Sequence, residues 1–166
     1  ITVTGLKPDS QQADKVILDI LKRCGGKFKL VEGGLHFDRS LLKATEIDLA
    51  DCPDLGPILF TLGCFCSGET VIRNAGRLRL KESDRIEAMQ TELRKMGARI
   101  EVDGDTVHTQ GVALHAPNAP LSGHNDHRIV MALAVAAIAS GLPALHWGAE
   151  AGDKASPASW RDLHGP

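Results

Sequence analysis

The segment DHRIVMALAVAAIASG, residues 126–141, decides the fold class because it is wholly apolar from Ile129 to Ala139. This run is too short to cross a membrane, and it is typical of a helix inside a protein core. The segment DLGPILFTLGCFCSG, residues 54–68, has the same character and also begins with an aspartate. A helix that is apolar on every side must be covered on every side, so the sequence predicts two enclosed helices.

The two apolar segments belong to an internal repeat. Their first residues, Asp54 and Asp126, are 72 positions apart, and the same interval aligns LKRCGGKF at 21–28 with LRKMGARI at 93–100. A repeat of this kind indicates that one supersecondary unit occurs more than once in the chain. The expected organisation is a single domain, 1–166, with two full repeats at about 1–69 and 70–141 and the start of a third at 142–166.

Each full unit is predicted to contain a strand, an amphipathic helix, three short strands and an apolar helix. The predicted strands are 1–6, 27–34, 35–37 and 45–49 in the first unit, and 70–75, 98–104, 106–111 and 113–116 in the second. The predicted amphipathic helices are 11–25 and 82–97, with Gly25 and Gly97 at their ends. The predicted fold class is therefore α/β (α+β), with sheets outside and buried parallel helices inside.

The composition limits the classes of function. The formal net charge is -2, so no global basic field favours nucleic acid, and no apolar run is long enough for a membrane span. Four cysteines without a CxxC pair, and no signal peptide at the start, favour buried reduced thiols and a cytoplasmic location. The pattern HNDH at 124–127 is only weak evidence for a metal site, because two histidines at that spacing lack further ligands.

A dense charge cluster, RLRLKESDRIEAM at 77–89, begins the second amphipathic helix. The repeat provides an internal control, because residues that only build the unit should recur at aligned positions. Arg85 aligns with Ala13, and Arg128 in the second apolar helix aligns with Gly56, so the scaffold requires neither arginine. An arginine in the first turn of a helix is unfavourable beside the positive end of the helix dipole. Its presence there indicates that the helix N-terminus and the guanidinium both face an anionic ligand.

Two interpretations of these residues remain open from the pattern alone. In the first, Asp54, Asp126 and Ser83 are helix caps, and Lys81 and Arg85 belong to a solvated helix face. In the second, the cluster binds an anion and moves protons. Three charged residues further along the helix are expected to be solvated: Glu87, Arg94 and Lys95.

Four segments occur in order along the chain: PDLGP (53–57), LRLKESDRIEAM (78–89), NDHRIVMALAVAA (125–137) and KASP (154–157). Together they resemble the motifs of the 3-phosphoshikimate 1-carboxyvinyltransferase (EPSP synthase) family. The resemblance implies βαβαββ-type units around buried helices, two globular halves, and an active site in the cleft between them. The chain resembles the C-terminal half, so the N-terminal half of the parent enzyme would be absent.

The resemblance also implies a reaction. The carboxyvinyl group of phosphoenolpyruvate (PEP) would move to the 5-hydroxyl of shikimate 3-phosphate, with release of phosphate, in the shikimate pathway of aromatic amino-acid biosynthesis. The expected partners are these two substrates and the missing N-terminal half, with no cofactor, no nucleic acid and no membrane. The chain alone is expected to be inactive.

Motif positions imply the roles of individual residues. Arg85 and Arg128 would clamp PEP, and Lys154 would be a further PEP contact and a candidate proton donor. Glu82 would transfer protons to and from the methylene carbon of PEP. His127 would lie beside PEP or orient Glu82.

For the second substrate, the resemblance implies that Asp54 holds or deprotonates the attacking hydroxyl and that Lys81 contacts shikimate 3-phosphate. The alternative class of function is a non-catalytic binding or structural module, including an RNA 3'-phosphate cyclase-like fold. The weak net charge and the absence of an aromatic stacking stripe disfavour an RNA ligand.

Overall fold

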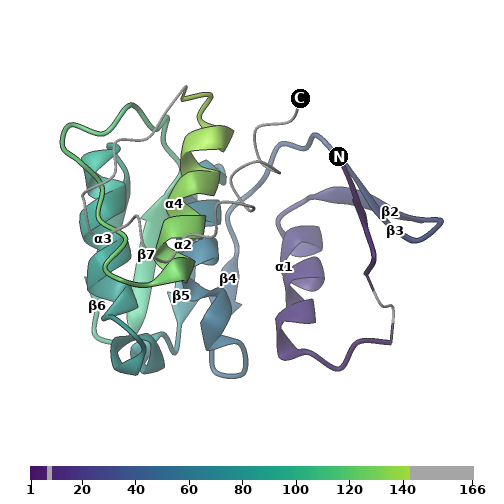
Figure 1. Cartoon of the computed structure of the whole chain (residues 1–166), viewed down its shortest axis with the longest axis horizontal. Helices are drawn as coiled ribbons and strands as arrows, with labels where there is room; N and C mark the ends of the chain where they lie inside the picture. Colours follow the sequence, from purple (N-terminus) through teal and green to yellow (C-terminus); the bar gives the residue numbers. More distant parts are fainter. Residues whose placement is uncertain (7–8, 143–166) are drawn as a thin grey trace.

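The computed structural model describes residues 1–6 and 9–142, which form two β-sheets with helices packed beside them (Figure 1). The strands are β1 (Thr2–Thr4), β2 (Lys27–Val31), β3 (Gly34–Asp38), β4 (Glu46–Asp48), β5 (Glu69–Arg73), β6 (Arg99–Asp103) and β7 (Thr106–Gln110). The α-helices are α1 (Ile17–Arg23), α2 (Gly56–Phe65), α3 (Arg85–Lys95) and α4 (His127–Ala139). Three short 3-10 helices precede α1, α2 and α3: η1 (Ala13–Val16), η2 (Pro53–Leu55) and η3 (Gly76–Leu80).

The first sheet has the strand order β1-β3-β2 and is antiparallel throughout. Gly33 adopts the left-handed conformation, φ 74°, in the tight turn between β2 and β3, so β2 ends at Val31, before the predicted end of the strand at residue 34. Helix α1 precedes β2 and buries Ile20 in the core. Gly25 after α1 and Gly97 after α3 both have φ 85°, which confirms the two predicted helix ends.

The second sheet has the strand order β4-β5-β7-β6, in which β4 and β5 are parallel and the other pairs are antiparallel. Parallel neighbours need a crossover, and α2 provides it between β4 and β5 while packing on β7. Gly63 permits this close packing, because a side chain there would overlap Thr109 of β7. Strands β2 and β6 begin 72 residues apart, at Lys27 and Arg99, and β3 and β7 keep the same interval.

The two apolar helices differ in how completely they are covered. Helix α2 packs against the second sheet, α3 and α4, and Leu59 and Phe60 are fully buried. Helix α4 packs on α2 and α3 (Figure 1), but its opposite face exposes Met131, Val135 and Ile138 by 60%, 39% and 45%. The prediction of a helix enclosed on every side is therefore wrong for α4 within residues 9–142.

Two other predictions about elements are wrong. Residues 113–116 form no strand. In the first unit the fourth strand, β4, pairs with β5, whereas the segment aligned with β5, residues 141–145, lies outside the described residues from residue 143 onward. The helix predicted from residue 82 begins at Arg85, because Asp84, and not Ser83, accepts hydrogen bonds from two amides of the first turn and caps it.

The buried thiols behave as the sequence predicts. All four cysteines are buried and free. Burial raises the pKa of Cys64 and of Cys66 to about 12, so both remain protonated at neutral pH. In the described part of the chain no helix is long and apolar enough to cross a membrane, and no three or more histidine, cysteine, aspartate or glutamate side chains are grouped so that they could hold a metal ion.

Candidate active site

Five of the predicted site residues meet in one ion-pair cluster. They come from three separate stretches: η2, the segment leading into α3, and the start of α4. The cluster contains three cations and three carboxylates: Lys81, Arg85, Arg128, Asp54, Glu82 and Asp126. Its formal charges balance, so an incoming anion must compete with an internal carboxylate for the cations.

Arg85 lies at the centre of this cluster, and its side chain is only 1% exposed. Its Nε donates to Asp126 over 2.7 Å, its Nη1 to Asp54 over 3.1 Å and its Nη2 to Glu82 over 2.6 Å. Burial by itself lowers the pKa of Arg85, but the three carboxylates raise it above its ordinary value, so the guanidinium stays charged. The interpretation of Arg85 as part of a solvated helix face is wrong.

Asp126 links α4 to α3. Its buried carboxylate accepts from Arg85, from the Ser83 hydroxyl at 3.2 Å and from the Arg128 amide at 2.9 Å. Burial acts to raise the pKa of Asp126, but the Arg85 hydrogen bond and the helix amide hold it below its usual range. Asp126 therefore caps α4, as predicted, and it also orients Arg85.

Asp54 is not a helix cap, since it lies inside η2. Its Oδ1 contacts Lys81 Nζ and Arg85 Nη1, each at 3.1 Å, and its Oδ2 accepts from Arg128 Nη2 at 3.3 Å. Arg128 also donates to the Asp54 backbone carbonyl over 3.1 Å. Partial burial raises the pKa of Asp54, but the neighbouring Lys81 and Arg128 outweigh it and hold the pKa below the ordinary value.

The remaining predicted residues lie differently. The Glu82 side chain is 54% exposed and contacts Arg85. His127 is exposed at the first position of α4, and within the described residues it forms no hydrogen bond or ion pair with Glu82. Lys154 lies outside the described residues, so its predicted role stays a prediction.

Some charged residues beside the cluster have structural contacts. Arg79 donates to Asp84 and to the Gly104 carbonyl, which ties η3 to the cap of α3 and to the β6–β7 turn. Of the three residues expected to be solvated on α3, Lys95 is not, because it is 24% exposed and donates to the buried Glu92. Glu92 and the role of Asp126 toward Arg85 were not predicted, since their partners are 30 to 41 positions away.

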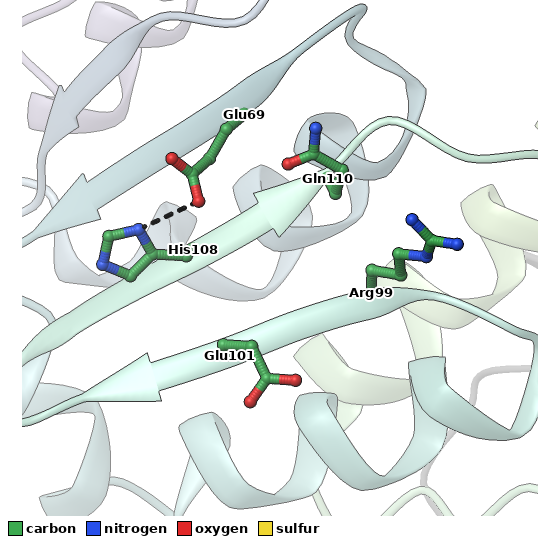
Figure 2. A pocket seen from close by; sticks show the side chains of 5 residues that line it. All are labelled: Glu69, Arg99, Glu101, His108 and Gln110. Carbon is green, nitrogen blue, oxygen red and sulfur yellow. Dashed lines mark ion pairs between the residues drawn. The ribbon is translucent and has the colours of Figure 1, made fainter.

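A shallow depression of about 280 Å³ lies on the second sheet, away from the core (Figure 2). It is lined by five residues of β5, β6 and β7: Glu69, Arg99, Glu101, His108 and Gln110. These residues are paired across the strands, and the intervening positions Ile72, Ile100 and Val107 are fully buried, so the depression is the solvent face of the sheet. It shares no residue with the cluster.

A family described as EPSP synthase (3-phosphoshikimate 1-carboxyvinyltransferase) matches residues 1–148. The chain belongs to the EPSP synthase family. The predicted family is confirmed, and its named members are enzymes.

Relatives of the same name agree with this membership. The chain is 40% identical over 155 residues to the 3-phosphoshikimate 1-carboxyvinyltransferase of Clostridium novyi (strain NT), covering 93% of this chain and 35% of that protein. It is 42% identical over 138 residues to that of Methanococcus maripaludis (strain C7 / ATCC BAA-1331), covering 82% and 32%. The chain therefore spans about a third of the length of these EPSP synthase family members.

Solved structures confirm the predicted fold class. An EPSP synthase from Acinetobacter baumannii superposes with a TM-score of 0.65 at 24% identity, covering 86% of this chain and 39% of that one. The enolpyruvyl transferase NikO from Streptomyces tendae superposes with a TM-score of 0.61 at 25% identity, covering 75% and 28%. Both share the mixed α/β architecture of this EPSP synthase family chain.

Proposed function

We propose that this chain is the C-terminal part of an enolpyruvyl transferase and that the ion-pair cluster binds PEP. The observation that most supports this is that the Asp54 carboxylate joins Arg85 and Arg128, which belong to different helices, over 3.1 and 3.3 Å. A ligand carboxylate or phosphate fits the same charge-assisted donor positions. Asp54 then acts as the internal counterion of an anion site.

In the proposed reaction, the 5-hydroxyl of shikimate 3-phosphate adds to the central carbon of PEP, and the methylene carbon gains a proton to become a methyl group. The methyl group loses a proton again as the C–O bond to phosphate breaks. Both steps need positioned acid–base groups. Asp54 accepts the proton of the hydroxyl, and Glu82 serves the methylene carbon, with Lys154 as a further candidate donor.

Binding of PEP changes the basicity of Asp54 in this proposal. In the free chain, Lys81 and Arg128 hold the pKa of Asp54 below its ordinary value, which makes it a weak base. An anion that engages Arg85 and Arg128 removes part of this stabilisation, so the pKa rises. Asp54 therefore becomes a stronger base when the substrate is bound.

The rest of the active site comes from outside this chain. The partly exposed side chains of Lys81 and Arg128, at 27% and 32%, are accessible to a second substrate and to the N-terminal half of the enzyme. Lys81 contacts shikimate 3-phosphate, and His127 lies beside PEP.

The buried, free thiols support the proposal of a cytoplasmic location.

Assembly with a complementary N-terminal half tests the proposed function. The chain is coexpressed with the N-terminal half of the Clostridium novyi relative, and phosphate release from PEP and shikimate 3-phosphate is measured. Because alignment of reactants contributes about 7–11 kcal/mol to such reactions, the chain alone should show no turnover and the assembled pair should release phosphate. An assembled pair that is inactive with both substrates, or an active isolated chain, contradicts the proposal.

A further inference from the structure

Glu92 is a second buried charge on the face of α3 that carries Arg85. The two residues are seven positions apart, which is two helical turns, so their side chains lie on one side of the helix. Both side chains are 1% exposed. Because a buried carboxylate is costly unless it is well paired, its partners indicate what it does.

Two partners of Glu92 lie in the segment that leads into α4, and a third, Lys95, lies on α3 itself. Its Oε2 accepts from the Ser122 amide at 2.9 Å, and its Oε1 contacts His124 Nε2 at 3.0 Å. Lys95 contacts both oxygens, at 3.0 and 2.8 Å, and donates to the Pro120 carbonyl over 2.9 Å. Burial acts to raise the pKa of Glu92, but these hydrogen bonds hold it below the ordinary value, so the carboxylate is charged.

The segment held by Glu92 has an unfavourable backbone. His124 and Asn125 are consecutive non-glycine residues in the left-handed region, with φ of 48° and 55°. Such a conformation persists only where its surroundings hold it in place. Glu92 holds one end of this turn, and the ion pair between Arg85 and Asp126 holds the other.

The repeat shows that the scaffold does not need this carboxylate. The position aligned with Glu92 is Ile20, which is also 1% exposed and lies in the apolar core. The residue aligned with His124 is Cys52, which is buried as well. A charged network therefore replaces apolar packing only in the unit that carries the arginines of the cluster.

We propose that Glu92 is a positioning residue that holds the turn at Ser122–Asn125 and thereby fixes Asp126 and Arg128 at the start of α4. Its effect on ligand binding rests on the proposed function, but its effect on the turn does not. The two effects can therefore be measured separately.

The first experiment follows amide hydrogen exchange in the free chain, with the variant Glu92→Gln. The Asp126 amide donates to the Gly123 carbonyl over 2.8 Å, and the Arg128 amide donates to Asp126, so both amides report on the turn. We expect exchange at both positions to accelerate about tenfold or more, as in local unfolding, with strand β7 unchanged. Equal acceleration in β7, or no change at the turn, overturns the proposal.

Matched variants separate positioning from stability. Glu87→Gln removes an exposed carboxylate of the same helix and should leave exchange at the turn unchanged. His124→Ala removes one partner of Glu92 and should accelerate exchange at the turn in the same direction, so it serves if Glu92→Gln does not fold. If Glu92 acts through its contact with His124, the turn amides of the double variant Glu92→Gln/His124→Ala should exchange little faster than those of Glu92→Gln. Additive increases in the exchange rate would contradict an action of Glu92 through His124.

The second experiment titrates inorganic phosphate into the chain and follows the Arg128 amide by NMR. We expect the apparent Kd to rise about 10-fold in Glu92→Gln, the lower end of the loss seen when a contact that orients a metal ligand is removed, and to stay unchanged in Glu87→Gln. If phosphate does not shift the Arg128 amide signal in the unaltered chain, the proposed anion site is contradicted. The effect of Glu92 on the turn is then still tested by the hydrogen-exchange experiment. An unchanged Kd in Glu92→Gln overturns the link between the turn and binding.

Discussion

Arg85 Nε donates a 2.7 Å hydrogen bond to Asp126 Oδ2, and both side chains are withdrawn from solvent. The bond joins the first residue of α3 to the residue that caps α4, so the starts of two helices are held together by one buried ion pair. Because a buried charge must be paired, this pair fixes the geometry of the cluster as well as its charge.

Loss of the Asp126 charge should destabilise the whole chain. In Asp126→Asn, the buried guanidinium of Arg85 loses its ion pair with the residue that caps α4. The asparagine leaves α4 with a weaker, uncharged cap. We expect the free energy of unfolding to fall by about 3 kcal/mol, as for other buried ion pairs that lose one partner. Urea unfolding measures it, with the exposed Asp51→Asn as the control that should change little. Equal free energies of unfolding for Asp126→Asn and Asp51→Asn would show that the charge of Asp126 does not stabilise the cluster.

The chain should lose stability in acid. The pKa values of Asp54, Glu92 and Asp126 are all lowered by their partners in the folded chain, from ordinary values of 3.8, 4.5 and 3.8. An unfolded chain therefore binds protons more readily, and stability present at neutral pH is lost as the pH falls through about 4.5 and below. Urea unfolding from pH 7 to pH 3 measures this loss. In Asp126→Asn the free energy of unfolding should fall less between pH 7 and pH 3. An unchanged fall contradicts the assignment of part of the acid sensitivity to Asp126.

The acidity of Asp54 should respond to anions. Sulfate at Arg85 and Arg128 competes with the Asp54 carboxylate for the same cations, so the pKa of Asp54 should rise when sulfate is bound. A pH titration of the Asp54 carboxyl carbon by NMR, with and without sulfate, measures the change, and Asp51 serves as the control. If sulfate moves the Arg128 amide signal but leaves the Asp54 titration unchanged, Asp54 is not the counterion of the site.

Glu82 and Arg128 should affect different kinetic constants in the enzyme assembled with its N-terminal half. Glu82→Gln should lower kcat by about 100-fold or more with a small change in the KM for PEP, because it removes a proton-transfer group. Arg128→Lys should chiefly raise the KM for PEP, because lysine cannot copy the bidentate geometry of arginine. Arg94→Lys, at an exposed arginine of α3, is the matched control. Glu82→Gln with an unchanged kcat removes Glu82 from the chemistry.

Local patterns predicted much of the fold. Gly25 and Gly97 marked helix ends, the two aspartates marked the apolar helices, and the interval of 72 residues appears again between β2 and β6. These features depend on backbone preferences and on periodicity, which act over a few residues. The exposed face of α4 could not be predicted, because coverage of a helix depends on which elements pack beside it.

The contacts of the candidate site were only partly predictable. Comparison of the repeats singled out Arg85 and Arg128 as additions to the scaffold, and the structure brings both to Asp54. Glu92 was not singled out from the sequence, since its partners Ser122 and His124 lie in a segment about 30 residues away. Its burial follows from packing against that segment, which no local pattern of α3 reveals.

A titration of the chain with PEP, followed by amide NMR, tests the proposed PEP site most directly. We expect the shifts to centre on residues 82–86 and 126–129, with an apparent Kd no tighter than roughly millimolar because the proposed N-terminal half of the cleft does not contribute, and added salt should reverse them. Arg128→Gln should abolish them, and Arg94→Gln should not. Shifts that centre on Glu69, Glu101 and His108 at the outer face of the second sheet, or shifts that persist unchanged in Arg128→Gln, would contradict the assignment of the ion-pair cluster as the PEP site.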